Sequence, residues 1–262
     1  MILAVDVGNS NTTVGLFNGT GELLFRALLE TSRSKTRDQC AIELLGVFQL
    51  YGADACTVDG AILSSVVPPL TTIFTDAIAR LTGIPPMVVG PGIRTGLNIK
   101  AEIHNQLGSD IVASSVAASA KYPSPIVMVD MGTATSLSLI VGSVYEGCII
   151  MPGLALALDA LSERAAALPP ISIETASPVG LMGHTTEEAM RSGVLYGHAS
   201  MVDGMLERIE ESIGQSVTTV ATGGNAPRIL RYCKRPIQYD ADLIMTGLYL
   251  LYQKNAKKYR KA

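Results

Sequence analysis

The sequence predicts an α/β fold built from two similar halves, and two observations carry this prediction. First, short apolar runs of strand type alternate along the chain with longer runs of helical spacing, which is the pattern of α/β proteins. Second, the opening stretch ILAVDVGNSNTTVGLF (2–17) has a counterpart in IVMVDMGTATSLSLIVGSVYEGCII (126–150). Each has an apolar strand, then Asp, one further residue, Gly and small hydroxyl residues, and then more strand. Asp6 and Asp130 are the matching acids.

The first half is expected to open with a strand at 2–7, because this run is apolar almost throughout. A second strand follows at 12–17, and NGTG (18–21) is a strong hairpin turn because Asn and Gly accept positive φ at low cost. The next segment, ELLFRALLE, fits either a third strand or the start of a helix. The other elements expected here are helices over 36–52 and 69–83, a buried strand at 60–67, a short strand at PMVVG and a loop at GPGIRTG (90–96).

The second half continues after SAKYPSP (119–125), whose two prolines make it the expected seam between domains. We therefore expect an N-terminal domain over 1–118 and a C-terminal domain over 119–262, with the last helix free to pack back on the first domain. The elements expected after the repeated strands are an amphipathic helix at 154–168, a long helical stretch at 185–214 capped by Thr185 or Thr186, a strand, Gly-Gly loop and helix start at 216–230, and a last helix at 241–259.

Composition excludes several classes of function. The net charge is -3, so no basic surplus points to nucleic acid or to an anionic membrane. The four cysteines form no CxxC pair, which argues against a zinc site. The start MILAVDVGN has no basic region and reaches an acid at position 6, so a signal peptide is not expected. No uncharged apolar stretch is long enough to span a membrane. We expect a cytoplasmic protein.

The loop after the first strand contains the first candidate site. Glycine at position 8 lets a ligand approach the backbone, and the Asn, Ser and Thr residues that follow offer short hydrogen-bonding groups. A carboxylate at Asp6 can hold a metal–phosphate complex through water. Alone, this pattern fits an ordinary hairpin entry with an Asx turn equally well. The second acid and hydroxyl-rich loop at Asp130–Thr135 favour a pair of phosphate-binding loops.

A third loop, Thr222-Gly223-Gly224-Asn225, lies between a strand and a helix start, where a flat purine could pack against the backbone. In order and spacing, the three loops resemble the phosphate-1, phosphate-2 and adenosine loops of the actin/Hsp70/hexokinase ATPase superfamily. The resemblance implies two ribonuclease-H-like domains with an inter-domain ATP cleft. A P-loop ATPase is excluded, because no GxxxxGK[ST] motif is present.

Asp110 is the candidate catalytic acid–base residue. It follows Gly108 and Ser109 and precedes an apolar helical run. An acid at a helix start is commonly a cap that complements the helix dipole. The functional interpretation is a general base, because kinase chemistry needs an acid that accepts the hydroxyl proton of the substrate.

Four segments together resemble the type III pantothenate kinase family over nearly the whole chain: DVGNSNTTVGLF, DMGTATSLSL, PGLALALDALSERAAALPPI (152–171) and GHTTEEAMRSGVLYG (183–197). The resemblance implies phosphorylation of pantothenate to 4'-phosphopantothenate, with ATP and Mg²⁺, in coenzyme A synthesis. It implies a potassium or ammonium ion near Asp130, and Asp110 as proton acceptor. It implies a homodimer with the substrate site near the interface. The implied ATP contacts are Asp6, Val7, Gly8, Asn9, Ser10, Asn11, Thr12, Thr13, Thr133, Gly223 and Gly224, and the implied substrate-site residues are Ala101, Gly108, Ser109, Asp110, Ile111 and Thr186.

Two positions depart from the family pattern. The family typically reads Gly-Ala-Asp-Arg where this chain has Gly108-Ser109-Asp110-Ile111, and usually has tyrosine where Ala101 aligns. Loss of the arginine is not conservative, since a guanidinium fork binds polar groups that an aliphatic side chain cannot. The sequence therefore leaves three outcomes open: pantothenate bound by other groups, another small hydroxyl compound as acceptor, or a weak or inactive nucleotide-binding regulatory homologue.

Overall fold

The computed structural model describes residues 1–100, 107–173 and 179–259. The chain forms two compact units. The first comprises Met1–Lys121 together with the chain from Asp242 onward, and the second comprises Tyr122–Ala241. Among the described helices, none is both long and apolar enough to cross a membrane.

The first unit is built on a sheet with strand order β3-β2-β1-β4-β5. β1 and β2 pair antiparallel, as do β2 and β3, whereas β1 pairs parallel with β4 and β4 with β5. All six residues of β1 are buried, as expected for a central strand covered on both faces. The strands are β1 (Ile2–Val7), β2 (Asn11–Phe17), β3 (Leu23–Glu30), β4 (Gly60–Ser65) and β5 (Met87–Val88).

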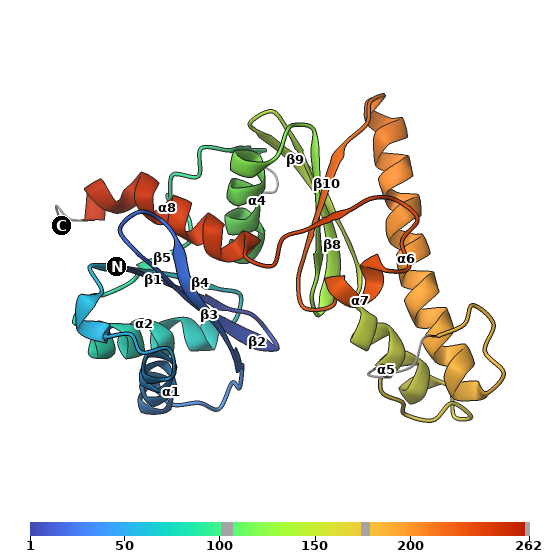
Figure 1. Cartoon of the computed structure of the whole chain (residues 1–262), viewed down its shortest axis with the longest axis horizontal. Coiled ribbons are helices and arrows are strands. Elements are labelled where there is room, and N and C mark those ends of the chain that lie inside the picture. Colours follow the sequence, from blue (N-terminus) through green and yellow to red (C-terminus); the bar gives the residue numbers. More distant parts are fainter. Residues whose placement is uncertain (101–106, 174–178, 260–262) are drawn as a thin grey trace. The chain divides into compact units, whose positions relative to one another are not determined.

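Helices cover both faces of this sheet. Alternate residues of β1 point to opposite sides, so Leu3 packs in the core with α1 and α2, and Ala4 packs in the core with α4 and α8. Figure 1 shows α1 and α2 on one face of the strands and α8 on the other. The bounds are α1 (Arg37–Leu50), η1 (Ala55–Thr57), α2 (Pro68–Thr82), β6 (Asn98–Ile99), α4 (Ser109–Lys121) and α8 (Leu243–Tyr259).

The second unit contains strands in the order β11-β10-β7-β8-β9. Its main core lies between one face of this sheet and the helices α5, α6 and α7, with Val127 and Leu137 packed among side chains such as Val202. The bounds are β7 (Ile126–Met131), β8 (Ala134–Val141), β9 (Val144–Pro152), α5 (Leu154–Arg164), α6 (Thr186–Ile213), β10 (Thr218–Thr222), α7 (Ala226–Leu230) and β11 (Gln238–Tyr239).

The two units share one strand plan, which confirms the repeat expected from the sequence. In each, the first strand pairs antiparallel with the second and parallel with the fourth. Asp6 and Asp130 are both the fifth residue of their six-residue strand. Asp6 is in register with Thr13 and Ser64. The duplication therefore places equivalent acids at equivalent strand ends.

The structure also differs from the sequence-based expectations, or decides between them, at four places. ELLFRALLE forms the edge strand β3 rather than a helix, and Thr185 rather than Thr186 is the N-cap of α6. The expected domain division between 118 and 119 falls inside α4, which continues to Lys121. The last helix, α8, belongs to the first unit, because its apolar side chains complete the core of that unit on one face of the sheet.

Candidate functional site

The turn between β1 and β2 forms the first group of candidate residues. The amide of Gly8 donates to the carbonyl of Asn11 at 3.0 Å, which closes the turn. Asn9 and Ser10 are exposed, whereas Asp6 is only 8% exposed. The turn therefore presents main-chain N–H groups and short polar side chains to solvent directly beside a largely buried carboxylate.

This turn is braced by Thr31, which the sequence analysis did not single out. The Thr31 amide donates to the carbonyl of Ser10 at 3.0 Å, and its hydroxyl lies 2.8 Å from the hydroxyl of Thr12. Thr12 is 1% exposed and Val7 is fully buried, so these two predicted ATP contacts are not accessible through their side chains. Asn11 is exposed and Thr13 is half-buried, which leaves their side chains accessible.

Asp110 is the second residue of α4 and is partly buried. The Ile111 amide donates to its Oδ1 at 2.8 Å. Burial raises the pKa of the Asp110 carboxyl, and hydrogen bonds from the backbone oppose this rise. A Cβ added to Gly108 would collide with Asp110 Oδ1, so glycine leaves room for this carboxylate. Such an environment suits a general base, whose pKa should approach the operating pH.

Ser109 ties this helix start to the end of β4. Its hydroxyl lies 2.9 Å from the hydroxyl of Ser64 and accepts the Ser65 amide at 3.1 Å. Ser64 is also the register partner of Asp6 on the neighbouring strand. Asp6 and Asp110 are thus carried by elements that meet at one edge of the first sheet. The missed signal was the Ser-Ser pair at the end of a buried strand, since ligand sites gather at the carboxyl ends of parallel strands.

In the second unit, the turn between β7 and β8 contains Gly132 and Thr133. Gly132 donates its amide to the carbonyl of Ala134 at 3.0 Å, so this turn, although one residue shorter than the turn at Gly8, also closes on the first residue of the next strand. Gly153 packs so closely on this turn that an added Cβ would collide with the carbonyl oxygen of Thr133. Gly153 is a further residue that the sequence analysis missed, because the contact joins segments far apart in the chain.

The Gly-Gly loop packs on the same turn. Gly223 has φ +93°, and an added Cβ would lie 2.6 Å from Asp130 Oδ1. Asn225 donates its amide to the Met131 carbonyl at 3.0 Å, and its side-chain amide donates to the Gly132 carbonyl at 3.2 Å. Gly224 faces open space and is exposed. The structure therefore places Asp130, Thr133 and the Gly-Gly loop close together within the second unit.

The remaining predicted residues are more scattered. Thr186 is exposed at the first position of α6, beside a cap in which Thr185 accepts the Glu188 amide at 3.2 Å. Ile111 is half-buried on α4. Ala101 lies outside the described residues. Within the described ranges, no group of three or more His, Cys, Asp or Glu side chains could hold a metal ion together.

A groove of about 330 Å³ lies between α5 and α6. Several apolar side chains on α5 and in the segment before α6 are exposed. Leu161 is 39% exposed at the groove, and Leu156 on α5 is also exposed. Leu181 and Met182 are exposed shortly before Thr186. The residues lining the groove are Pro152, Ala157, Leu161, Gly193, Val194, Gly197, His198 and Met201.

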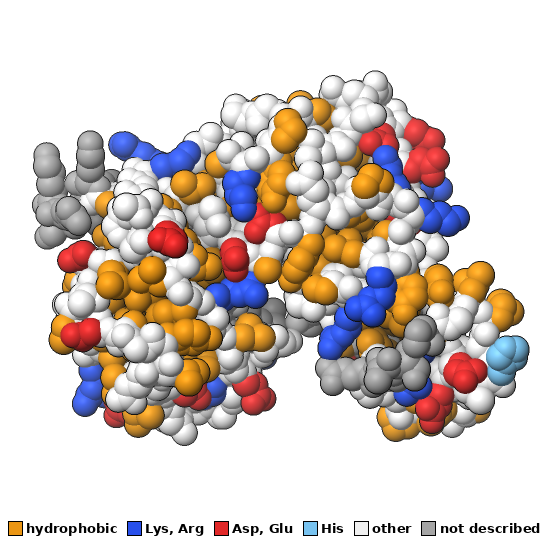
Figure 2. Space-filling view, in the orientation of Figure 1, with side chains coloured by type: hydrophobic (Ala, Val, Ile, Leu, Met, Phe, Trp, Pro, Cys, Tyr) orange, Lys and Arg blue, Asp and Glu red, His pale blue; other side chains and the backbone are white. Residues whose placement is uncertain are grey.

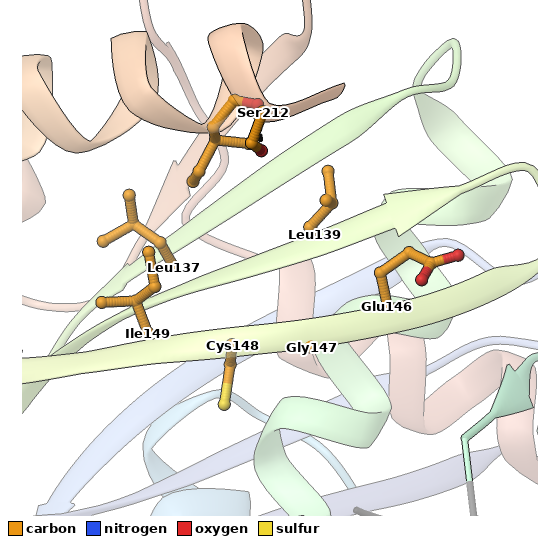
Figure 3. A pocket seen from close by; sticks show the side chains of 8 residues that line it. Leu137, Leu139, Glu146, Gly147, Cys148, Ile149 and Ser212 are labelled. Atoms are coloured by element: carbon orange, nitrogen blue, oxygen red, sulfur yellow. Dashed lines mark hydrogen bonds between the residues drawn. The ribbon is translucent and has the colours of Figure 1, made fainter. Parts of the chain in front are cut away.

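Each unit also has a further apolar feature at its surface. One is a hollow of about 170 Å³ in the second unit. Figure 3 shows Leu137, Leu139 and Ile149 from β8 and β9 on the side that faces Ser212 of α6. On the first unit, Leu28 of β3 and Ile42 of α1 are 65% and 68% exposed, and Figure 2 shows apolar side chains grouped on the face of this unit turned to the viewer. None of the candidate ATP or substrate residues lines the hollow.

Two α/β units with the same strand plan, each with an acid near the end of its first strand and a polar turn after it, have the two-domain fold of the actin/Hsp70/hexokinase class. Solved structures share this fold. An activator of 2-hydroxyisocaproyl-CoA dehydratase from Clostridium difficile, with bound ADPNP, superposes with a TM-score of 0.58 at 10% identity, covering 99% of this chain and 97% of that one. A ROK hexokinase from Thermus thermophilus gives 0.52 at 14% identity, covering 98% and 99%.

The sequence comparison is more specific. The family model described as type III pantothenate kinase matches residues 2–208. A type III pantothenate kinase from Exiguobacterium sp. is 38% identical over 258 residues, covering 98% of this chain and 100% of the relative. One from Geobacillus thermodenitrificans is 39% identical over 259 residues, covering 98% and 99%. The chain belongs to the type III pantothenate kinase family.

Proposed function

We propose that this protein transfers a phosphoryl group from ATP to the primary hydroxyl of pantothenate, forming 4'-phosphopantothenate. Membership of the family supports this reaction. The observation that carries it within the structure is the link from Asp110 through Ser109 and Ser64 to the strand edge that bears Asp6. A candidate proton acceptor and a candidate phosphate loop thus belong to one edge of one sheet.

Asp110 would accept the proton of the attacking hydroxyl. Phosphoryl transfer requires mainly positioning and charge stabilisation, so the base must be held in place and ionised at the operating pH. Burial raises the pKa of Asp110, while the Ile111 amide holds Oδ1 and favours the ionised form. The ionised carboxylate would then receive the proton of the attacking hydroxyl.

The polar turns would hold the polyphosphate. Main-chain N–H groups and hydroxyls in the 8–13 turn suit phosphate oxygens, and Thr133 and the open backbone at Gly224 suit the nucleotide in the second unit. The carboxylate oxygens of Asp6 and Asp130 are of the donor type that hard cations prefer, so these residues fit Mg²⁺ and a monovalent cation respectively. When bound, these ions neutralise phosphate charge.

The acceptor would be selected by groups around Asp110. Gly108, Ser109 and Ile111 flank it, and Thr186 would reach the substrate from a second copy of the chain. Ile111 offers apolar contact instead of a guanidinium fork. Pantothenate must therefore obtain its polar contacts from other groups, and a panel of small alcohols tests whether it remains the preferred acceptor.

We propose that the protein acts as a cytoplasmic homodimer whose contact includes the groove between α5 and α6. Gly193 and Gly197 are exposed along α6 and allow a partner helix to approach closely. Leu161 and Met182 supply exposed apolar area on the same unit. A partner on this face lies next to the segment that carries Thr186.

The test is ADP formation by purified protein with Mg-ATP, with and without pantothenate, in potassium or sodium buffer. We expect pantothenate to stimulate ADP formation strongly, potassium to be required, and a phosphorylated product to be detected by mass spectrometry. Absence of stimulation by pantothenate would refute the proposal, and stimulation by a different alcohol would identify another acceptor. The Asp110→Asn variant is the control for catalysis at this site.

A further inference from the structure

His198 is a buried histidine in the middle of α6 that the predicted site does not use. It is 5% exposed, and its Nε2 lies 2.8 Å from the hydroxyl of Thr135, which is 1% exposed. Burial lowers the pKa of the imidazole, which keeps it neutral near pH 7. A neutral ring can either donate to or accept from the threonine hydroxyl at this distance. This side-chain hydrogen bond joins α6 to β8, and its two residues are 63 positions apart in the sequence.

Thr135 lies directly after the turn between β7 and β8, on which Gly153 and the Gly-Gly loop pack. It is the second residue of β8 and is in register with Met131 on β7 and Met151 on β9. The turn between β7 and β8, with Thr133, lies directly before it. Gly153, which packs on that turn, lies directly after the end of β9. A restraint on Thr135 therefore acts on the start of the strand that shapes the turn.

His198 also lies beside the groove between α5 and α6. The ring borders the groove between α5 and α6, together with Val194 and Met201. One imidazole thus connects the wall of that groove with the root of the phosphate-binding turn. A core residue that only filled space would not need a polar ring at this place, because apolar side chains surround the pair.

We propose that His198 is a positioning residue for the nucleotide. Its neutral imidazole holds Thr135, and through it the Gly132–Thr133 turn, in the conformation that binds the polyphosphate of a nucleoside triphosphate. This inference rests on the proposed function, because it assumes that this turn binds ATP. His198 does not touch the reacting atoms, and its effect is on nucleotide affinity rather than on the proton transfer at Asp110.

The test compares two substitutions at Thr135. Thr135→Val keeps the shape but removes the hydroxyl, whereas Thr135→Ser keeps the hydroxyl. Tyr145→Phe is the matched control, because it removes a buried hydroxyl of β9 that lies 3.0 Å from the hydroxyl of Ser138. Ser138 is on the same strand as Thr135 but lies further from the turn. Affinity for ADP and for a non-hydrolysable ATP analogue is measured by calorimetry, which needs no turnover.

We expect Thr135→Val to weaken nucleotide binding about three- to tenfold, the range that loss of one hydrogen bond supports. Thr135→Ser and Tyr145→Phe should stay within about twofold of the wild type, since each keeps the bond to His198. The KM for ATP should rise in parallel in Thr135→Val, with the KM for pantothenate unchanged. Equal affinity in Thr135→Val and wild type, or equal loss in the Val and Ser variants, would overturn the proposal.

A second pair of variants, at His198, controls for a folding defect. His198→Gln keeps a group that can hydrogen bond, and His198→Phe does not; circular dichroism confirms that each is folded. The combination of His198→Phe with Thr135→Val should bind nucleotide no more weakly than the worse single variant, and additive losses would contradict the link. If the wild type binds nucleotide but does not phosphorylate pantothenate, the proposed function fails while these affinities still decide the role of His198.

Discussion

Replacing Ser109 with alanine removes the hydroxyl that joins α4 to β4. Ser109→Ala also restores the residue that the family typically carries at this position. In this chain the change would leave the hydroxyl of Ser64, which is fully buried, without the partner now 2.9 Å away. The Ser65 amide would lose the acceptor now at 3.1 Å. Both losses occur at the start of the helix that carries Asp110.

The magnitude follows from these contacts. A buried hydroxyl left unsatisfied costs roughly 1–3 kcal/mol. Alanine recovers about 0.5 kcal/mol through its higher helix propensity. We therefore expect the free energy of unfolding to fall by about 1–2 kcal/mol, which lowers the melting temperature by roughly 2–8 °C. Because Asp110 follows directly, its displacement should also lower kcat by about tenfold.

Urea denaturation and steady-state kinetics measure the two effects. The Ser64→Ala/Ser109→Ala double variant is the control, because removing both partners leaves no unsatisfied hydroxyl, and its loss of stability should be smaller than the sum of the single losses. A Ser109→Ala protein with wild-type stability and wild-type kcat would show that this hydroxyl pair neither stabilises α4 nor positions the base.

Four further outcomes are expected. Asp110→Asn should lower kcat by about 10²–10⁴ with nucleotide affinity unchanged. Because burial raises the folded-state pKa of Asp110 above its ordinary value of 3.8, the wild type should lose stability as pH rises through the raised pKa, and urea titrations of the variant should show a smaller loss. Gly223→Ala, with φ +93° and a Cβ 2.6 Å from Asp130 Oδ1, should cost about 1–2 kcal/mol or more and weaken nucleotide binding in calorimetry, whereas Gly224→Ala should be nearly neutral. Gly197→Glu should convert the proposed dimer to a monomer in sedimentation experiments, and a dimer that persists would exclude the groove as the contact face.

Local patterns were sufficient to predict the acids and their loops. The runs before Asp6 and Asp130 are almost entirely apolar, which is typical of strands buried on both faces, and the repeated order of acid, glycine and hydroxyl residues predicted equivalent strand ends. The segment that formed β3 remained ambiguous, because the pairing with β2 that decides its conformation is not visible in local spacing.

The supporting contacts could not be predicted, because they join distant segments. Ser64 meets Ser109 across 45 residues, and Thr135 meets His198 across 63. No periodicity encodes such pairs, and each residue alone resembles ordinary strand or helix composition. The same reason explains Gly153, whose need for a missing Cβ becomes visible only when the turn at Thr133 is folded against it.

The place of α8 has a consequence for the order in which the chain folds during synthesis. Leu248 and Leu251 of α8 cover the face of the first sheet formed by residues such as Ala4 and Ile62. Gly247 fits against the main chain of Ala113, so α8 also packs closely on α4.

The ribosome releases α8 after all of residues 122–241. The second unit is continuous in sequence and is complete before α8 emerges, whereas until then one apolar face of the first sheet has only α4 to cover it. Domains ordinarily fold from the N-terminus onward as they emerge. In this chain the unit that starts first is completed last, and its exposed sheet face is the surface that a nascent-chain chaperone would have to shield.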